Sequence, residues 1–502
     1  MNRKRMLAYA AAVWVALLLI LTAAEHGAAG SGIRTVWDAA WYSFATLSTA
    51  GYGDLVPVTP VGRIVGVLLM LMSVGVWAAL IGIVWTTLRD RVLPGWRLAQ
   101  AAGKPWYVFS ERNEASEALA WDLAKQDKGS AAVFCSDGKA SGRPEGASGL
   151  SVSMGIDELT ASRFARKGPR ILFLMNRDGW ANASAAETLA AGGMTIYSRG
   201  EEATAVPGVH CFDPAVMCAR QYWLRHPAGP EETVFLIIGD GERARALLLE
   251  GLTACCREPF HETRFRVSGD WADFRRMHPE INDDFQDAGR NADREELEKA
   301  DRIILAAEDE RANAEQATAI TRAFPLHGTV HAATALPAAC DGRFGLPEEI
   351  YTGELVMHQG LDRMAVALHR AYGERTGDRT PWETLSPFLK DSNRAAADHL
   401  LTKIRLLLPE EDVRRADASA CRRAAERYAA LSPEEKEKCL RNEHARWCLF
   451  HRIHNWRYAP ARDNSRREHP CLTSFDSLSE ADRDKDGTAW DMIGPLAKEA
   501  EL

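Results

Sequence analysis

Two long apolar runs without charge constrain the fold of this 502-residue chain more than any other feature. Residues 6–24 and 64–88 contain no Lys, Arg, Asp or Glu. At a rise of about 1.5 Å per residue, a helix of either length crosses a hydrocarbon core of roughly 30 Å. A cleaved signal peptide is the alternative for residues 6–24, although the apolar part of such peptides spans only about 7–15 residues. We therefore predict two membrane spans, with a water-soluble region from about residue 100 onward.

The distribution of charge predicts the orientation of the spans and the kind of partner. Basic residues flank the pair of runs, and few lie between them: Arg3, Lys4, Arg5, Arg89, Arg91 and Arg97 outside, against Arg34 and Arg63 between. The positive-inside rule then places both termini in the cytoplasm and residues 25–63 in an outer re-entrant loop of the plasma (inner) membrane. Residues 1–100 carry a formal charge of +4 and the whole chain −8, so the remainder carries −12. An acidic soluble region argues against nucleic acid as a partner.

The segment between the two runs has the composition of an ion-selective filter, residues Thr49, Ala50, Gly51, Tyr52 and Gly53. A ring of backbone carbonyls can replace the hydration shell of an ion if successive peptides point their oxygens to one axis. That geometry needs left-handed backbone positions, which glycine adopts at little cost. We predict that Thr49 to Tyr52 coordinate a dehydrated cation and that residues 36–47 form a short pore helix. The alternative is an ordinary glycine-rich turn in a two-span membrane anchor.

These residues resemble the potassium-channel family, whose filter reads Thr-Val-Gly-Tyr-Gly-Asp. The likeness covers about residues 10–90, and Ala50 departs from the usual Val or Ile. It implies a homotetramer in a lipid bilayer, since four such loops close one ring. Neither span carries the Arg-rich pattern of a voltage sensor. Gly75 and Gly82 are candidate bending points or packing positions of the inner helix, while the usual hinge glycine of the family falls on Ser73.

The pattern after residue 105 alternates short apolar strands with helices, which predicts two Rossmann-like units in tandem. Their place after a two-span pore resembles the regulator-of-conductance (RCK) domains of potassium channels. Gly239 and Gly241 follow a predicted strand and fit a phosphate-binding turn for a nucleotide cofactor. The acidic partner expected about 20 residues later is missing, and Asp270 is the nearest substitute. The alternative is that the glycines only make the tight turn from strand to helix.

Residues 441–493 resemble the ryanodine-receptor (RyR) repeat, and 380–400 align with 473–493 as a second copy at an offset of 93 residues. We predict that aromatic faces and cations of this region bind a small cytosolic, nucleotide-like effector: His444, Arg446, Trp447, Trp456, Arg457, Tyr458 and Arg462. One alternative is that these aromatic side chains only pack in the core, a role that fits Trp447 on its predicted helix better than Trp456. A zinc site is another, formed by cysteines and histidines between Cys439 and Cys471. All ten cysteines lie in the predicted cytosolic part, so we expect free thiols.

The predicted fold is a membrane α-helical tetrameric pore, a cytosolic α/β Rossmann-like tandem and an all-α RyR-repeat domain. The predicted domains are 1–97, 98–228, 229–343 and 344–502. The predicted function is a ligand-gated potassium channel without enzymatic activity. The alternatives are a constitutive channel whose tail docks another protein, and a membrane-anchored nucleotide-processing enzyme, for which no acid/base constellation is visible.

Overall fold

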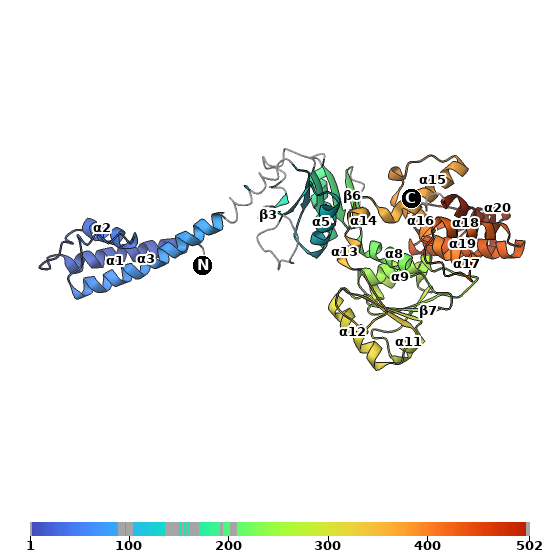
Figure 1. Ribbon diagram of the computed structural model, residues 1–502, viewed down its shortest axis with the longest axis horizontal. Coiled ribbons are helices and arrows are strands. Elements are labelled where there is room, and N and C mark those ends of the chain that lie inside the picture. The colour runs from blue at the N-terminus through green and yellow to red at the C-terminus, as the bar shows by residue number, and fades with distance from the viewer. Residues whose placement is uncertain are drawn as a thin grey trace. The chain divides into compact units, whose positions relative to one another are not determined.

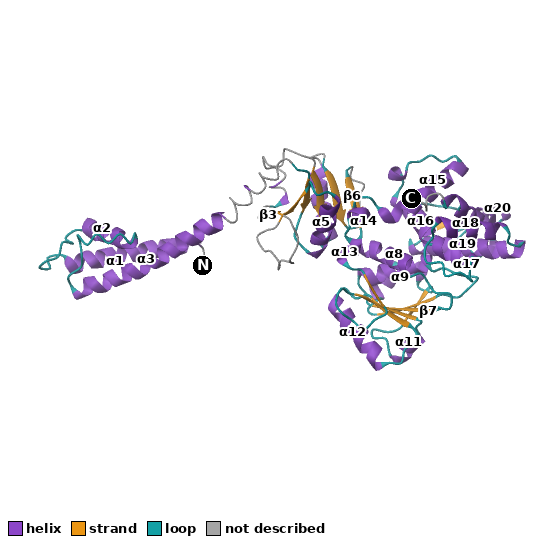
Figure 2. Ribbon diagram, in the orientation of Figure 1, coloured by secondary structure: helices purple, strands orange, loops and turns teal. Residues whose placement is uncertain are grey.

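The computed structural model describes residues 3–88, 96, 104–135, 150–152, 155–156, 159, 170–190, 194–200 and 208–497. The chain forms two compact units, Met1–Ala102 and Gly103–Leu502. The first is helical, and the second contains two parallel sheets and a mostly helical C-terminal part (Figures 1 and 2).

Residues 3–88, the continuous described stretch of the first unit, contain three helices: α1 (Arg3–Glu25), α2 (Val36–Leu47) and α3 (Pro60–Thr87). The bounds of α2 are those predicted for the pore helix. Thr35 begins α2 with a capping box to Asp38, and Thr59 caps α3, which has Pro60 in its first turn. A small core of apolar side chains from all three helices, with Leu21, Tyr42 and Leu69 among its members, holds them together.

A buried carboxylate ties the end of α1 to the start of α3. Glu25 accepts hydrogen bonds from the backbone N–H groups of Val58 (3.1 Å) and Thr59 (2.9 Å) and from the Thr59 hydroxyl (2.6 Å). Gly62 is required here, because a Cβ at this position would lie 2.0 Å from Glu25 Oε1. The carboxylate therefore fixes how the loop between α2 and α3 enters α3.

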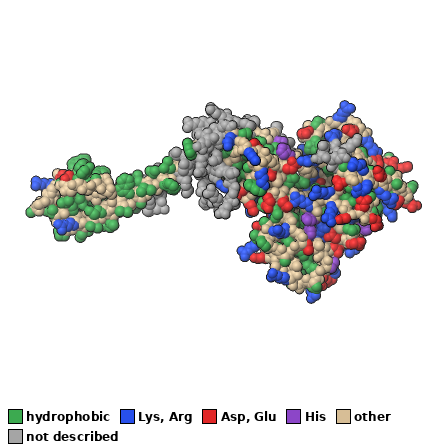
Figure 3. All heavy atoms as spheres, in the orientation of Figure 1, with side chains coloured by type: hydrophobic (Ala, Val, Ile, Leu, Met, Phe, Trp, Pro, Cys, Tyr) green, Lys and Arg blue, Asp and Glu red, His purple; other side chains and the backbone are tan. Residues whose placement is uncertain are grey.

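Of the two predicted membrane spans, one lies on a helix that is long and apolar enough to cross a membrane. Helix α3 meets that standard by length and composition, whereas the described apolar stretch of α1 covers only Ala12–Glu25. Hydrophobic side chains cover much of the visible face of this unit, and large aliphatic residues of α3 such as Leu71 and Val74 are exposed (Figure 3). The helices α1 and α3 are present, and the crossing of the membrane by both stays a prediction.

The second unit contains two six-stranded parallel sheets with the same strand order. The first runs β3-β2-β1-β4-β5-β6 and the second β12-β11-β10-β7-β8-β9, which is the doubly wound Rossmann order in both cases. Their bounds are β1 Trp106–Phe109, β2 Ala131–Cys135, β3 Leu150–Val152, β4 Arg170–Leu174, β5 Thr195–Arg199, β6 Val209–Phe212, β7 Val234–Ile238, β8 Arg264–Ser268, β9 Phe285–Asp287, β10 Arg302–Leu305, β11 Thr329–Ala333 and β12 Gly342–Phe344. The prediction of two Rossmann-like units is confirmed, and the strands missed from the sequence are β3, β6, β9 and β12.

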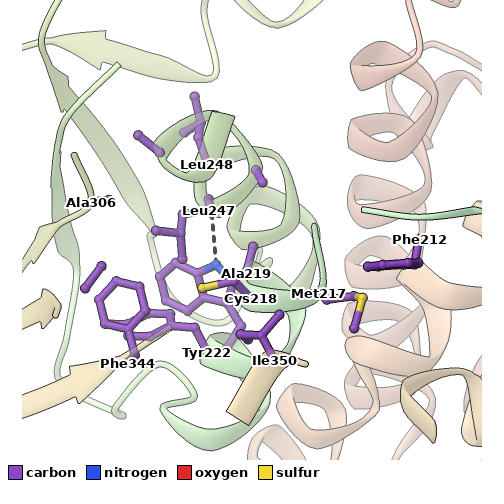
Figure 4. Packing of buried hydrophobic residues seen from close by; sticks show 14 of the residues in the cluster. Phe212, Met217, Cys218, Ala219, Tyr222, Leu247, Leu248, Ala306, Phe344 and Ile350 are labelled. Atoms are coloured by element: carbon purple, nitrogen blue, oxygen red, sulfur yellow. Dashed lines mark hydrogen bonds between the residues drawn. The ribbon is translucent and has the colours of Figure 1, made fainter. Parts of the chain in front are cut away.

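The helices of the Rossmann-like units have these bounds: α5 Glu114–Gln126, α7 Gly179–Ala190, α8 Pro214–Arg225, α9 Glu242–Ala254, α10 Ala272–Met277, α11 Arg294–Lys299 and α12 Glu310–Ala323. Helix α8 ends the first Rossmann-like unit and packs along α9 of the second. The Trp223 indole of α8 donates to the Leu247 carbonyl of α9 (2.9 Å). Tyr222, Phe344 and Ile350 lie close together in the same core (Figure 4). The two sheets thus share one continuous apolar core.

The C-terminal part, from about residue 347, is mostly helical and contains a repeated arrangement. Its helices are α13 Pro347–Ile350, α14 Gly353–Val356, α15 Arg363–Thr376, α16 Pro387–Asp398, α17 Leu400–Leu407, α18 Ala418–Ala429, α19 Pro433–Ile453, α20 Glu480–Asp491 and α21 Ile493–Leu496, with short strands β13 Arg457–Tyr458 and β14 Glu468–His469. Helices α16 and α20 begin 93 residues apart, and so do the 3₁₀ turns before them, Trp382–Thr384 and Phe475–Ser477. Ser386 and Ser479 cap the two helices alike. The internal repeat is confirmed, while its membership in the RyR family stays a prediction.

A buried ion-pair network joins this part to α8. Arg220 donates through Nε to Asp398 (2.6 Å) and through Nη1 to Asp362 (2.6 Å), and Arg394 also binds Asp362. The side chains of Arg220, Asp362 and Asp398 are each under 10% exposed. Buried charges need such partners, because an unpaired one loses its hydration without compensation. This network connects the first Rossmann-like unit to the C-terminal helices.

Candidate pore and candidate cytosolic ligand site

The filter residues follow the C-terminal end of α2 directly. Gly51 (φ +56°) and Gly53 (φ +73°) lie in the left-handed region, as a carbonyl ring requires. Thr49 also has a positive φ (+60°), which was not expected from the sequence, whereas Ala50 and Tyr52 do not. The backbone therefore alternates at successive positions of the filter. Residues 48–54 are exposed in the single chain.

Helix α2, the predicted pore helix, contacts the predicted filter through Trp41. The Trp41 ring stacks on Tyr52, with centroids 5.9 Å apart and planes 10° apart, and its indole donates to Asp54 (2.8 Å). The Gly51 N–H donates to the Ala45 carbonyl (3.1 Å). Of the two tryptophans of α2 that could brace Tyr52, Trp41 does so, while Trp37 is 84% exposed. A single aromatic side chain of α2 thus contacts both Tyr52 of the predicted filter and Asp54 directly after it.

The glycines of the second Rossmann-like unit serve close packing. A Cβ on Gly239 (φ +133°) would lie 2.9 Å from the backbone of Ala306 and Ala307. Gly241 caps α9, and the Glu308 carboxylate accepts the N–H of Arg243 (3.2 Å) in the first turn of that helix. A carboxylate of the chain thus already binds where a phosphate would meet the helix N-terminus. This geometry favours the tight-turn alternative for Gly239 and Gly241.

Three of the seven residues predicted to bind the effector are buried. Trp456 is 6% exposed and stacks on Phe388 of the first repeat copy, with centroids 5.4 Å apart. His444 and Arg446 are buried on the inner face of α19. Tertiary packing causes this burial. The two repeat copies pack against each other, and the loop that carries Trp456 fills the space between them.

The other expected residues lie nearer the surface. Trp447 is half-buried, and its ring centroid lies 3.9 Å from that of His451. Arg457 is exposed and forms an ion pair with Glu468 (2.8 Å), and Tyr458 and Arg462 are exposed as well. The seven residues therefore divide between the protein interior and its surface, and they do not form one open binding face.

Arg446 belongs to a buried chain of charges. The Glu443 carboxylate contacts both Arg446 (2.6 Å) and the Lys403 ammonium of α17 (2.7 Å). Burial alone would raise the pKa of Glu443, but the two neighbouring cations hold it well below its usual range. Burial lowers the pKa of Lys403. Arg446 thus stabilises the packing of α19 on α17.

A cleft of about 550 Å³ lies between the second Rossmann-like unit and α19. Ligand-binding pockets commonly have such a volume. One wall comes from the β8–β9 region, including Arg264, Phe285 and Gln286, and the other from α19 and the loop after it, including Arg441 and His444. No sequence pattern indicated this cleft, because its walls are far apart in the chain and meet only in the folded protein.

Polar contacts between the same two elements hold the walls of the cleft together. Arg452 of α19 pairs with Asp284 (2.6 Å) beside β9. The Asn442 amide donates to the backbone carbonyls of Cys256 (3.1 Å) and Glu258 (2.8 Å). The cleft therefore lies at a fixed junction between the Rossmann-like and helical parts. Among the described residues no group of His, Cys, Asp and Glu could hold a metal ion, so the zinc alternative is not supported.

The membrane unit matches a known family. Residues 6–90 match the family model described as "Ion channel". A voltage-gated potassium channel of Aeropyrum pernix is 38% identical over 71 residues, which are 14% of this chain and 24% of that protein. The calcium-gated potassium channel TvoK of Thermoplasma volcanium is 40% identical over 50 residues, 10% of this chain and 14% of that protein. The chain thus spans about a quarter or less of the length of these curated relatives.

Solved structures resemble the chain more weakly. The GsuK channel covers 72% of this chain and all of its own, with 14% identity and a TM-score of 0.30. The same channel bound to ADP has a TM-score of 0.28 at 14% identity. At TM-scores this low, the likeness supports no conclusion about the assembly or the ligand of this chain.

Proposed function

We propose that the chain is the subunit of a homotetrameric, potassium-selective channel whose cytosolic region binds a small effector. The observation that carries the proposal is the filter: alternating left-handed backbone at Thr49, Gly51 and Gly53, at the end of a pore helix and braced by Trp41. In a tetramer, four such loops would bring the carbonyls of Thr49 to Tyr52 around one axis as potassium ligands. Both termini would then be cytoplasmic, and the exposed apolar faces of α1 and α3 would meet lipid or neighbouring subunits.

Potassium flux into liposomes from the purified full-length protein tests the pore. Gly53→Ala forces a side chain onto a left-handed backbone position, so it should abolish potassium-selective flux and leave the tetramer assembled. Gly75→Ala is the control for selectivity, because it makes the same change inside α3, away from the filter, and should keep the preference for potassium over sodium whatever it does to gating. Potassium over sodium selectivity that survives in Gly53→Ala would refute the filter assignment.

We place the effector in the 550 Å³ cleft, which revises the site predicted from the sequence. Its walls belong to the second Rossmann-like unit and to the C-terminal helices, so a ligand there contacts both. Two arginines line the cleft, Arg264 paired with Glu262 (2.7 Å) and Arg441 paired with Glu437 (2.6 Å) and Asp476 (2.5 Å). A nucleotide-like anion would take the place of these carboxylates on the guanidinium groups. A ligand shifts the channel only by its differential affinity for the open and closed forms.

Calorimetry on the full-length protein with ATP, cyclic AMP and NAD as probes tests this site. Arg441→Gln should weaken binding of the active probe at least tenfold. Arg423→Gln removes an exposed arginine of α18 that is paired with Glu411, and it should leave binding unchanged. If none of the three probes changes the potassium flux or gives a heat of binding, the alternative of a constitutive channel with a docking tail would be favoured.

A further inference from the structure

Helix α19 places a cysteine beside a histidine and an aspartate at the edge of the cleft. Cys448 lies one helical turn after His444, and its sulfur is 3.4 Å from His444 Nε2. On the other side of the ring, His444 Nδ1 is 3.3 Å from the Asp486 carboxylate of α20. A thiol, an imidazole and a carboxylate therefore stand in the order that generates a reactive thiolate.

The first repeat copy shows which part of this arrangement is structural. His369 binds the Thr380 carbonyl (2.7 Å) as His444 binds that of Thr473 (2.9 Å), so both histidines hold the loop before a 3₁₀ turn. Four residues after His369 stands Gly373, not cysteine. The position that corresponds to Asp486 is Asn393. The thiol and the carboxylate are additions of the second copy, beyond what holding the loop requires.

The electrostatics of the trio favour an ion pair between sulfur and ring. Burial opposes protonation of His444, but Asp486, Cys448 and the Thr473 carbonyl raise its pKa to about 10, so the ring is charged at neutral pH. An adjacent imidazolium stabilises a thiolate. Burial raises the pKa of Cys218, Cys255, Cys256, Cys421 and Cys439 to about 11 or 12, and it also raises the pKa of Cys471.

Cys448 is 7% exposed, its residue lines the cleft, and a second thiol lies on the neighbouring loop. Cys448 and His444 both line the 550 Å³ cleft. The Cys448 sulfur is 3.9 Å from the backbone carbonyl of Cys471, so the loop that carries the second thiol lies against the first. Cys471 is half-buried, and its N–H donates to His469 (3.1 Å).

We propose that Cys448 is a peroxide-reactive thiolate held by His444 and Asp486, with Cys471 as its resolving thiol. The Cys448 thiolate attacks one oxygen of a hydroperoxide, an S–O bond forms and the O–O bond breaks. The leaving alkoxide, or hydroxide from hydrogen peroxide, takes the proton of the His444 imidazolium. Sulfur is oxidised by two electrons to a sulfenic acid, and the peroxide is reduced by two. The Cys471 sulfur then attacks this sulfur, the S–S bond forms and the S–O bond breaks, and the Cys471 thiol proton goes to the departing hydroxide, which leaves as water.

The test uses hydrogen peroxide on the full-length, detergent-solubilised protein, with peptide mass spectrometry. Wild type should form a Cys448–Cys471 disulfide, and Cys471→Ser should instead accumulate a sulfenic acid on Cys448 that dimedone traps. Iodoacetamide labelling of Cys448 should stay fast down to pH 6.5. Asp486→Asn keeps the His444 bond to Thr473, and it should slow labelling at pH 6.5 at least tenfold.

Cys439→Ser is the control, since it removes a buried thiol of the same helix, and it should change neither rate nor product. Wild-type labelling of Cys448 that rises tenfold per pH unit up to pH 8.5, as an isolated thiol does, would overturn the proposal. Equal rates in wild type and Asp486→Asn would do the same. All these readouts are independent of ion flux, so they stand or fall apart from the pore assignment.

Discussion

Replacing Arg220 should open the junction between the first Rossmann-like unit and the C-terminal helices. In Arg220→Met, Asp398 loses the two bonds that Arg220 makes to it, while Asp362 keeps Arg394. Breaking one partner of a buried ion pair costs about 3–5 kcal/mol, because the remaining charge stays desolvated. Since about 1.4 kcal/mol is a factor of ten in an opening equilibrium, amide exchange of α8 and α16 should accelerate about 10²- to 10³-fold or more.

Hydrogen exchange followed by mass spectrometry on the full-length protein measures this change. Arg225→Met is the matched control on the same helix: Arg225 pairs with Glu349 at 2.6 Å, but its side chain is 49% exposed. Exposed pairs contribute only about 0–1 kcal/mol, so this variant should exchange nearly as wild type does. Equal acceleration in both variants, or none in Arg220→Met, would refute the reasoning that burial makes the difference.

Three further changes follow from single contacts. Gly62→Ala should push the Glu25 carboxylate from the start of α3 and cost about 1–3 kcal/mol, seen as a lower midpoint in thermal unfolding of the solubilised protein, unlike Gly75→Ala. Trp456→Ala should destabilise the C-terminal part by about 3–5 kcal/mol, measured by exchange in α16 and α19, because it empties a core position; a folded variant with only weaker effector response would contradict this. The raised pKa of His444 stabilises the fold fully below its unfolded value of about 6.5, and this contribution is lost as pH rises through about 10. The difference in unfolding midpoint between wild type and His444→Gln should therefore shrink from pH 6.5 to pH 10, and a constant difference would refute the assigned ion pair.

Local patterns predicted the pore helix and the longer strands because their signals are contained in a few neighbouring residues. The uncharged runs, the two filter glycines and the strand at 234–238 are examples. The missed strands β3, β9 and β12 have three residues each, too few for a periodic pattern.

Contacts between residues far apart in the chain could not be predicted from the sequence. The aromatic faces of Trp456 looked available because Phe388, which covers them, lies in the other repeat copy. The cleft has the same origin, since its walls are brought together only by α19. A cation beside an aromatic ring is a common feature of both binding sites and protein interiors, and burial alone separates the two cases.

The network around Arg220 has a consequence for synthesis of the chain on the ribosome. Asp398 follows Arg220 by 178 residues. At about 5–20 residues per second, translation needs about 9–36 s to deliver this acceptor. During that interval the Arg220 guanidinium of α8 lacks its bond to Asp398. Helix α9, which packs against α8, has already been synthesised. A nascent chain that ends near residue 343 would keep that arginine without Asp362 or Asp398, and so would any product truncated there. Completion of the first Rossmann-like unit thus waits for the last third of the polypeptide.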